Sequence, residues 1–359
     1  MQNNAWKRLL ALTTAAVLSL SGCQKAPPAP TASPLAAEEH RDNTFFAMDT
    51  VMSFTVYGPH AEEALAAATD RVNSLERLLS VTLEDSEVWK LNHAEGESVR
   101  ISPETNALLR SARELGETTG GALDITMYPV LKTWGFTTGD YRVPSGDELE
   151  KALALVDYRA VQVEPDETGP ADATLPAGME VDFGALAKGY AGELCAGMLR
   201  GMGVTSAILR LSGNIQTVGA KPDGSAWRIG IQNPNGNAND NVGILEIIDQ
   251  AAVTSGGYQR FFEADGVRYW HIIDPATGAP ARSGLTSVTI VADSGTLCDG
   301  LSTALFVMGL DKGLGYWRAH RDFECILMDE EQNIWITPGL ADAFTLVDGS
   351  GYTLHIVEE

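Results

Sequence analysis

The sequence predicts an α+β fold in which a mostly antiparallel sheet is flanked by helices. Two observations support this class. From residue 204 onward, runs with strand composition follow one another closely, and one clear helix interrupts them between residues 295 and 310. The chain shows neither an internal repeat nor the regular alternation of strands and helices that builds a parallel sheet. Helices and strands are therefore segregated along the chain.

The first 22 residues have the features of an export signal. Lys7 and Arg8 precede the apolar run LLALTTAAVLSL, which is shorter than the about 20 residues that a helix needs to cross a bilayer. The tetrapeptide LSGC is typical of a bacterial lipobox, which predicts that Cys23 is the lipidated first residue of the mature protein. Ordinary secretion with an incidental Cys23 is the alternative. We therefore expect an exported protein, anchored at Cys23 to the outer face of the cytoplasmic membrane or to the periplasmic face of an inner membrane.

Residues 23–43 are rich in Pro, Ala and Ser and show no apolar periodicity. Such a segment cannot build a core, so we interpret it as an extended tether. The remaining residues, 44–359, are enough for one large domain or for two closely packed ones.

The elements of this segment follow in order. Residues 44–58 predict a strand, and residues 59–80 predict a helix because their apolar positions share one face: Leu65, Ala68, Val72, Leu75 and Leu79. A second helix is expected from Ser102 and Pro103 to the glycine pair 120–121. A third begins at Ser145, which can form a capping box with Glu148.

The charge of the chain excludes some partners. The net charge is −23, and removal of the leader takes away two basic residues and no acidic one, which leaves −25. A protein this acidic should not bind nucleic acid, and it can hold a phosphate-bearing ligand only where a local cation reverses the field. The other cysteines, Cys195, Cys298 and Cys325, show no C-x-x-C spacing, so we expect small core residues and neither a disulfide framework nor a zinc site.

Two stretches predict groups that could act on a phosphate. In VDFGALAKGYAGELCAGML, a short strand is expected to end at Asp182 and a helix to run from Ala187. Lys188 and Gly189 then lie at a helix start that favours anions, although no P-loop is present. In CDGLSTALFVMGL, Asp299 and Thr303 share a helix face and offer oxygen ligands to Mg²⁺. The alternatives are a lysine without a ligand, and an Asp299 that only caps its helix while Thr303 bonds back to a carbonyl.

Two further stretches lie at expected strand ends. Asp124, in TGGALDIT, is expected where a strand begins and could bind a ribose or a flavin edge, whereas the following Trp134 and Phe136 are expected in the core. In HIIDPATGAP, a strand is expected to deliver His271 and Asp274 to a rim before the turn at Pro275. This second stretch is either a catalytic edge or an ordinary turn.

Seven motifs in this order resemble the ApbE family of FAD:protein FMN transferases: Met48-Asp49-Thr50, GGALDIT, VDFGALAKGY, LSGN, TSGGYQRFF, HIIDPATG and DGLSTALFVMG. The resemblance covers the chain from about Phe45 onward. It implies a single T-fold-like catalytic domain that takes FAD as substrate and Mg²⁺ as cofactor. FMN would be moved to a threonine hydroxyl of an exported or membrane-bound acceptor protein, forming a phosphoester and releasing AMP.

The resemblance also implies roles for individual residues. Asp299 and Thr303 would be metal ligands through their side chains and Ala185 through its carbonyl. His271 would be the base that takes the proton of the acceptor threonine, which suits an imidazole whose ordinary pKa is about 6.5. Lys188 would contact FAD, and the remaining pocket residues would be Met48, Ala122, Leu123, Asp124, Asp182 and Ile273.

Two departures from the family pattern keep other functions open. Asp49 stands where relatives often have glycine, and Thr82 stands where some relatives place an aromatic residue over the flavin. A Mg²⁺-dependent FAD pyrophosphatase that produces FMN and AMP is therefore one alternative. A non-catalytic, membrane-tethered solute-binding lipoprotein is another.

Overall fold

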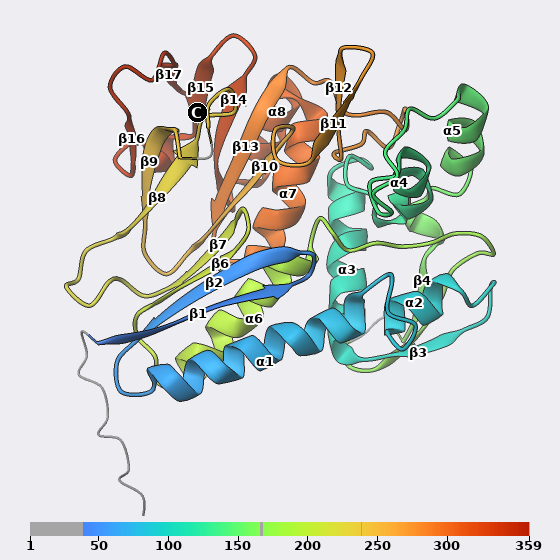
Figure 1. Ribbon diagram of the computed structural model, residues 1–359, viewed down its shortest axis with the longest axis horizontal. Coiled ribbons are helices and arrows are strands. Elements are labelled where there is room, and N and C mark those ends of the chain that lie inside the picture. The colour runs from blue at the N-terminus through green and yellow to red at the C-terminus, as the bar shows by residue number, and fades with distance from the viewer. Residues whose placement is uncertain (1–38, 166–167, 238, 359) are drawn as a thin grey trace, which may run out of the picture. The chain divides into compact units, whose positions relative to one another are not determined.

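A nine-stranded sheet forms the centre of the computed structural model, which describes residues 39–165, 168–237 and 239–358 (Figure 1). Neighbouring strands pair antiparallel except the last two. The predicted mostly antiparallel α+β fold is thus confirmed. Across the sheet the strands are β1 (His40–Ala47), β2 (Thr50–Tyr57), β6 (Ala207–Leu211), β7 (Asn214–Val218), β10 (Ala251–Gly256), β13 (Leu285–Ala292), β14 (Glu324–Asp329), β15 (Asn333–Ile336) and β17 (Thr353–Ile356).

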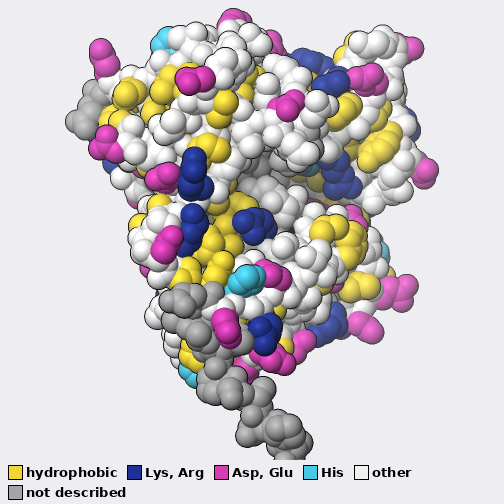
Figure 2. Space-filling view, turned by 60° about the vertical axis from the view of Figure 1, so that its left-hand side comes forward, with side chains coloured by type: hydrophobic (Ala, Val, Ile, Leu, Met, Phe, Trp, Pro, Cys, Tyr) yellow, Lys and Arg dark blue, Asp and Glu magenta, His cyan; other side chains and the backbone are white. Residues whose placement is uncertain are grey.

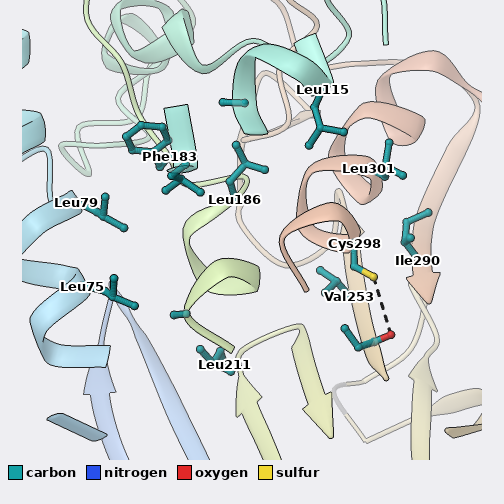
Figure 3. Packing of buried hydrophobic residues seen from close by; sticks show 14 of the residues in the cluster. Leu75, Leu79, Leu115, Phe183, Leu186, Leu211, Val253, Ile290, Cys298 and Leu301 are labelled. Carbon is teal, nitrogen blue, oxygen red and sulfur yellow. Dashed lines mark hydrogen bonds between the residues drawn. The ribbon is translucent and has the colours of Figure 1, made fainter. Parts of the chain in front are cut away.

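Helices cover one face of this sheet. Figure 3 shows how α1, α6 and α7 bury apolar side chains against β6, β10 and β13, with Leu115 of α3 beside Leu301 of α7. The thiol of Cys298 lies 4.0 Å from the Ala251 carbonyl. All three described cysteines are buried and free, as expected. The helices of this layer are α1 (Ala61–Leu79), α3 (Pro103–Thr118), α6 (Ala187–Gly201), α7 (Gly295–Met308) and α8 (Leu310–His320).

A second, smaller sheet packs on the opposite face. It consists of β16 (Phe344–Leu346), β9 (Asn241–Ile247) and β8 (Trp227–Gln232). Because successive side chains of a strand point to opposite faces, Leu209 of β6 joins the helical layer whereas its neighbour Ile208 packs with Trp227 of the small sheet. The central strands are therefore apolar on both sides.

The remaining elements are short. They are the ribbon β11 (Phe261–Ala264) and β12 (Val267–Trp270), the sheet β3 (Val99–Ile101), β5 (Ala171–Thr174) and β4 (Gln162–Glu164), the helices α2 (Glu87–Asn92), α4 (Tyr128–Trp134) and α5 (Gly146–Leu153), and the 3-10 turns η1 (Ile125–Met127), η2 (Tyr158–Ala160) and η3 (Pro338–Leu340). Trp134 and Phe136 belong to an apolar cluster here, as predicted. Among the described residues, no helix is both long and apolar enough to cross a bilayer.

The caps and faces of the predicted helices are confirmed. Ser102 accepts a hydrogen bond from the N–H of Thr105 at the start of α3, and Ser145 and Glu148 form the expected capping box on α5. The five apolar positions predicted to share a face of α1 are all buried. Helix α8 was not predicted, because it buries only three residues and is separated from α7 by Gly309 alone.

Three strand predictions need correction. Residues 44–58 do not form one strand: they form the β1–β2 hairpin, which turns at Met48 (φ 48°) and Asp49 (φ 63°). Tight hairpin turns usually carry Asn-Gly or Asp-Gly, and this pair lacks that signal. No strand ends at Asp182, and β12 stops at Trp270, before His271. Strand β1 starts at His40, inside the predicted tether, whose residues 23–38 lie outside the described part together with the predicted leader and Cys23.

Candidate active site

One pocket lies at the end of the main sheet where several chain turns meet. Its volume is about 370 Å³, and its wall includes the β1–β2 turn, the C-terminal end of α1, the start of α6, the β6–β7 turn, and parts of β10 and α7. All eleven residues that the sequence assigned to catalysis, FAD binding and metal binding line it: Met48, Ala122, Leu123, Asp124, Asp182, Ala185, Lys188, His271, Ile273, Asp299 and Thr303. The fold therefore brings together residues that are up to 255 positions apart in the chain.

Helix α7 places Asp299 in the pocket wall. The carboxyl group is only 4 % exposed, and its Oδ2 accepts a hydrogen bond from the Gly189 N–H at 2.8 Å. Burial raises the pKa of Asp299, while the Lys188 charge and the Gly189 N–H oppose that rise. Ser294 caps α7 by accepting from the Leu297 N–H at 3.2 Å, so the alternative that Asp299 is the cap is wrong.

Thr303 lies one turn further along the same helix. Its Oγ1 is 3.4 Å from the Ser255 hydroxyl on β10, so its neighbour is another side chain and not the helix carbonyl that the alternative predicted. Asp299, Thr303 and Ala185 all line the pocket, and the oxygen groups of these residues are a carboxylate, a hydroxyl and, for Ala185, the peptide carbonyl. No group of three or more His, Cys, Asp or Glu side chains in the described part of the chain could hold a metal. This donor set suits only a hard cation that takes its remaining ligands from phosphate and water, as Mg²⁺ does.

The start of α6 lies against Asp299. No side chain caps this helix, and the Ala187 N–H in its first turn donates to the Phe183 carbonyl at 2.8 Å. The Gly189 N–H already donates to Asp299, so one of the groups expected to bind a phosphate holds a carboxylate instead. The Lys188 ammonium donates to the Gly184 carbonyl at 3.1 Å and favours the charged forms of Asp182 and Asp299.

Positive charge in the pocket is scarce. Among the described residues that line it, the only cationic side chains are Lys188 and Arg260, against five carboxylates: Asp49, Glu76, Asp124, Asp182 and Asp299. Burial raises the pKa of Asp182 and of Asp124. On the face shown in Figure 2, Asp and Glu side chains are spread over the surface, with Lys and Arg side chains among them. Within the pocket, a phosphate-bearing ligand depends on Lys188, Arg260 or a bound cation.

His271 follows β12 directly and is held by the backbone of Arg260. Its N–H and its ring Nδ1 both lie 3.2 Å from the Arg260 carbonyl. Because a carbonyl can only accept, this contact assigns the proton of the neutral ring to Nδ1 and leaves the Nε2 lone pair available. Burial lowers the pKa of His271 to about 4, and the charges of Arg260 and Lys188 lower it further against the hydrogen bond to Arg260. The ring is thus neutral at pH 7.

The two aspartates expected at strand ends, Asp274 and Asp124, instead stabilise turns. Asp274 accepts at Oδ1 from the Ala276 N–H at 2.9 Å and through its carbonyl from Gly278 at 2.8 Å, so it builds the turn and does not line the pocket. Asp124 begins no strand. It caps η1 by accepting from the Thr126 N–H at 2.8 Å, and its other oxygen accepts from the Tyr158 N–H at 3.1 Å. Short polar side chains favour such caps over strand starts.

The pocket also holds residues to which the sequence assigned no role. Asn214 comes from the motif LSGN, and Ser255 and Arg260 come from TSGGYQRFF. The guanidinium of Arg260 donates to the Phe136 carbonyl. The motifs marked these segments, but their composition does not say which of their side chains face the pocket.

Comparison with known proteins gives a consistent result. The model of the ApbE family matches residues 48–327. The chain is 32 % identical over 315 residues to the FAD:protein FMN transferase of Treponema pallidum, covering 83 % of this chain and 87 % of that protein. It is 31 % identical over 340 residues to the FAD:protein FMN transferase of Salmonella typhimurium, covering 91 % and 95 %.

Solved structures agree. The crystal structure of the ApbE protein from Thermotoga maritima superposes with a TM-score of 0.76 at 31 % identity, covering 86 % of this chain and 97 % of the other. The apo form of the flavinyl transferase ApbE from Pseudomonas stutzeri gives a TM-score of 0.72 at 30 % identity, covering 82 % and 92 %.

Proposed function

Because the chain belongs to the ApbE family, we propose that it is an FAD:protein FMN transferase, an enzyme that moves FMN from FAD to an acceptor protein. The observation that carries this proposal is the single pocket that gathers His271, Lys188, Asp299 and Thr303 at the end of the sheet. The named activity of the curated relatives supports the same reaction. It also disfavours a non-catalytic solute-binding lipoprotein.

We propose that the acceptor group is a threonine hydroxyl. Its oxygen forms a bond to the FMN phosphorus, the bond between that phosphorus and the AMP oxygen breaks, and AMP leaves. His271 takes the hydroxyl proton at Nε2, because Nδ1 is committed to the Arg260 carbonyl. Lys188 and Arg260 offset the charge of the pyrophosphate, and positioning provides most of the remaining rate enhancement in such reactions.

The residues present fit a Mg²⁺ ion. Asp299 is a buried carboxylate with a raised pKa, which a nearby cation would stabilise in its charged form, and Thr303 and Ala185 line the same pocket. We propose that these three groups hold Mg²⁺. When bound, the ion would neutralise charge on the phosphate oxygens.

Hydrolysis of FAD is the competing reaction, and one observation favours it. Thr82 is exposed and lines the pocket without supplying an aromatic ring, so the flavin side of the pocket is less covered here than an aromatic residue would make it. Water could then replace the acceptor hydroxyl and release free FMN and AMP.

We further propose that the enzyme acts on exported or membrane-bound acceptors and is itself lipid-anchored at Cys23. The support is the leader and lipobox in the sequence. Membrane fractionation of cells that carry wild-type protein or Cys23→Ala tests this. Wild-type protein should stay in the membrane fraction and the variant should not, and equal release of both would remove the anchor from the proposal.

The central experiment uses the chain from His40, where β1 begins, with FAD, Mg²⁺ and an acceptor domain that contains a single candidate threonine. Intact mass spectrometry of the acceptor and quantification of AMP and free FMN are done in parallel. We expect the acceptor to gain one FMN per AMP released, and to gain none when its threonine is replaced by alanine. AMP with free FMN and no labelled acceptor would support the pyrophosphatase instead.

Two variants test the assigned residues. His271→Asn should still bind FAD but label the acceptor about 10²- to 10⁴-fold more slowly, as is typical for loss of a general base. Asp299→Ala should lose most activity together with its Mg²⁺ dependence. Activity of Asp299→Ala equal to wild type, or no effect of a chelator, would contradict the metal assignment.

A further inference from the structure

The two motifs without assigned residues meet beside the proposed metal ligands. The Thr254 N–H of β10 donates to the Gly213 carbonyl in the β6–β7 turn at 3.1 Å. A Cβ on Gly213 would lie 2.9 Å from the Thr254 carbonyl, so the two backbones approach more closely than any side chain would allow. This close contact brings Asn214 and Ser255 to the pocket wall that α7 completes.

Asn214 is a buried donor without an acceptor. Its side chain is 5 % exposed and its Nδ2 has no hydrogen-bond partner among the described residues. The amide lies beside Asp299 and lowers the pKa of its carboxyl group as a hydrogen-bond donor does, yet the pair does not meet the distance and angle of a hydrogen bond. A buried N–H without a partner costs free energy, so this geometry indicates a contact that is completed when the pocket is filled.

Ser255 contacts α7 at two points. Its hydroxyl lies 2.8 Å from the Ser302 hydroxyl and 3.4 Å from that of Thr303, and Ser302 in turn donates to the Asp299 carbonyl at 2.9 Å. The position of the Thr303 oxygen is thus tied to β10. Because the Ser255 hydroxyl already forms a hydrogen bond with Ser302, Ser255 is better suited to orient Thr303 than to bind a metal ion itself.

We propose that Asn214 and Ser255 are positioning residues: Asn214 holds the Asp299 carboxylate and Ser255 holds the Thr303 hydroxyl in the orientation that binds the cation. The inference rests on the Mg²⁺ site of the proposed function. Groups that orient metal ligands in this way typically change metal affinity or activity by 10- to 100-fold when they are removed.

The chain offers matched controls. Gln216 lies two residues after Asn214 on the same face of β7 and is 3 % exposed, but it does not line the pocket. Ser287 of β13 pairs with Gly256, next to Ser255, and is also buried and outside the pocket. Gln216→Leu and Ser287→Ala therefore report the general cost of removing a buried polar group from these strands.

The experiment measures cation affinity apart from turnover. Mn²⁺ is titrated into each protein in the presence of ADP, whose pyrophosphate stands in for that of FAD, and free Mn²⁺ is counted by electron paramagnetic resonance. We expect Asn214→Leu and Ser255→Ala to raise the Mn²⁺ dissociation constant about 10-fold or more. Ser255→Thr, which keeps the hydroxyl, should restore affinity, and both controls should stay within twofold of wild type.

A second readout separates positioning from folding. In the transferase assay, the two variants should need about 10-fold more Mg²⁺ for half-maximal rate but recover most of kcat at saturating Mg²⁺. If both variants bind Mn²⁺ as wild type does while Asp299→Ala does not, the positioning role is wrong and the metal site stands. If Asp299→Ala also binds Mn²⁺ normally, the metal site of the proposed function fails, and this inference fails with it. Losses of equal size in the controls would likewise overturn the inference, because they would show a structural effect alone.

Discussion

A single methyl group at Gly189 should disturb both the helix packing and the proposed metal site. Gly189 lies in the first turn of α6, where the backbones of α6 and α7 touch. A Cβ added there would lie 2.1 Å from the Gly295 carbonyl oxygen and 2.6 Å from the Asp299 Cβ. Because the nearest obstacle is backbone, no side chain can rotate out of the way, and the helices must separate by about 0.9 Å to reach the 3.0 Å below which Cβ contacts are essentially never seen.

The size of the effect follows from three contributions. Overpacking of a tight contact costs about 1–3 kcal/mol. Separation also weakens the 2.8 Å hydrogen bond from the Gly189 N–H to the Asp299 carboxylate, and hydrogen bonds to charged groups are worth about 1.5–3 kcal/mol. Replacing glycine by alanine in a helix stabilises the folded protein by about 1 kcal/mol, which offsets part of this loss. We expect Gly189→Ala to lower the free energy of unfolding by about 1.5–5 kcal/mol.

Gly197→Ala is the control in the same helix. Nothing lies within 4 Å of a Cβ at Gly197, so alanine can be accommodated there without a clash. Because alanine has the higher helix propensity, the substitution should raise the free energy of unfolding by up to about 1 kcal/mol. Chemical denaturation followed by circular dichroism measures both variants, and Mn²⁺ titration measures the metal site. Only Gly189→Ala should bind Mn²⁺ more weakly.

One result would refute this reasoning. If Gly189→Ala is as stable as Gly197→Ala and binds Mn²⁺ as wild type does, the close approach of α6 and α7 neither limits packing nor sets the position of Asp299.

Three other predictions follow from the pocket wall. Because burial lowers the pKa of His271 to about 4, the imidazole is mostly neutral above about pH 5. The value of kcat/KM for FMN transfer should therefore stay level from about pH 5.5 to 8 and fall only in more acidic buffer. A half-maximal rate near pH 6.5 would show an imidazole with its ordinary pKa and contradict this prediction. Asp49→Gly removes a side chain from a left-handed backbone conformation (φ 63°), so the protein should unfold at the same or a slightly higher temperature. The substitution also removes a carboxylate from the pocket, so FAD should bind more tightly. A decrease of about 1 kcal/mol or more in the free energy of unfolding would contradict this prediction. Thr82→Tyr should add an aromatic stacking surface worth about 0.5–1.5 kcal/mol and lower the FAD dissociation constant roughly 2- to 10-fold. The ratio of free FMN to labelled acceptor should fall, and an unchanged ratio would show that Thr82 does not set the choice between transfer and hydrolysis.

Local signals in the sequence determined much of the helical layer. The caps at Ser102 and Ser145, the buried face of α1 and the start of α6 near Lys188 all lie where the sequence placed them. Each depends on residues within one or two turns of one another, so composition and spacing carry the information. The ordered motifs likewise contain all eleven residues that the sequence assigned to the pocket, from Met48 in the first motif to Thr303 in the last.

Strand ends were less predictable than helix starts. The turn at Met48 and Asp49 has a left-handed backbone without the usual glycine, and Asp124 caps a 3-10 turn where a strand was expected. In both cases the local sequence is compatible with more than one backbone conformation, and contacts with distant segments select one of them. The Met48 N–H donates a hydrogen bond to Glu76 on α1, and Asp124 accepts one from the Tyr158 N–H. Propensity alone cannot rank such alternatives.

Only the tertiary structure decided the chemistry of the site. Asp299 receives its hydrogen bond from Gly189, 110 residues away, and this contact exists because two glycine-bearing helices touch along their backbones. The proton position on His271 depends on the Arg260 carbonyl, and its lowered pKa depends on burial and on the charges of Arg260 and Lys188. Hydrogen-bond geometry and desolvation are properties of the packed chain. The sequence could therefore name Asp299 and His271 but could not show how Asn214 and Ser255 lie beside the proposed metal ligands.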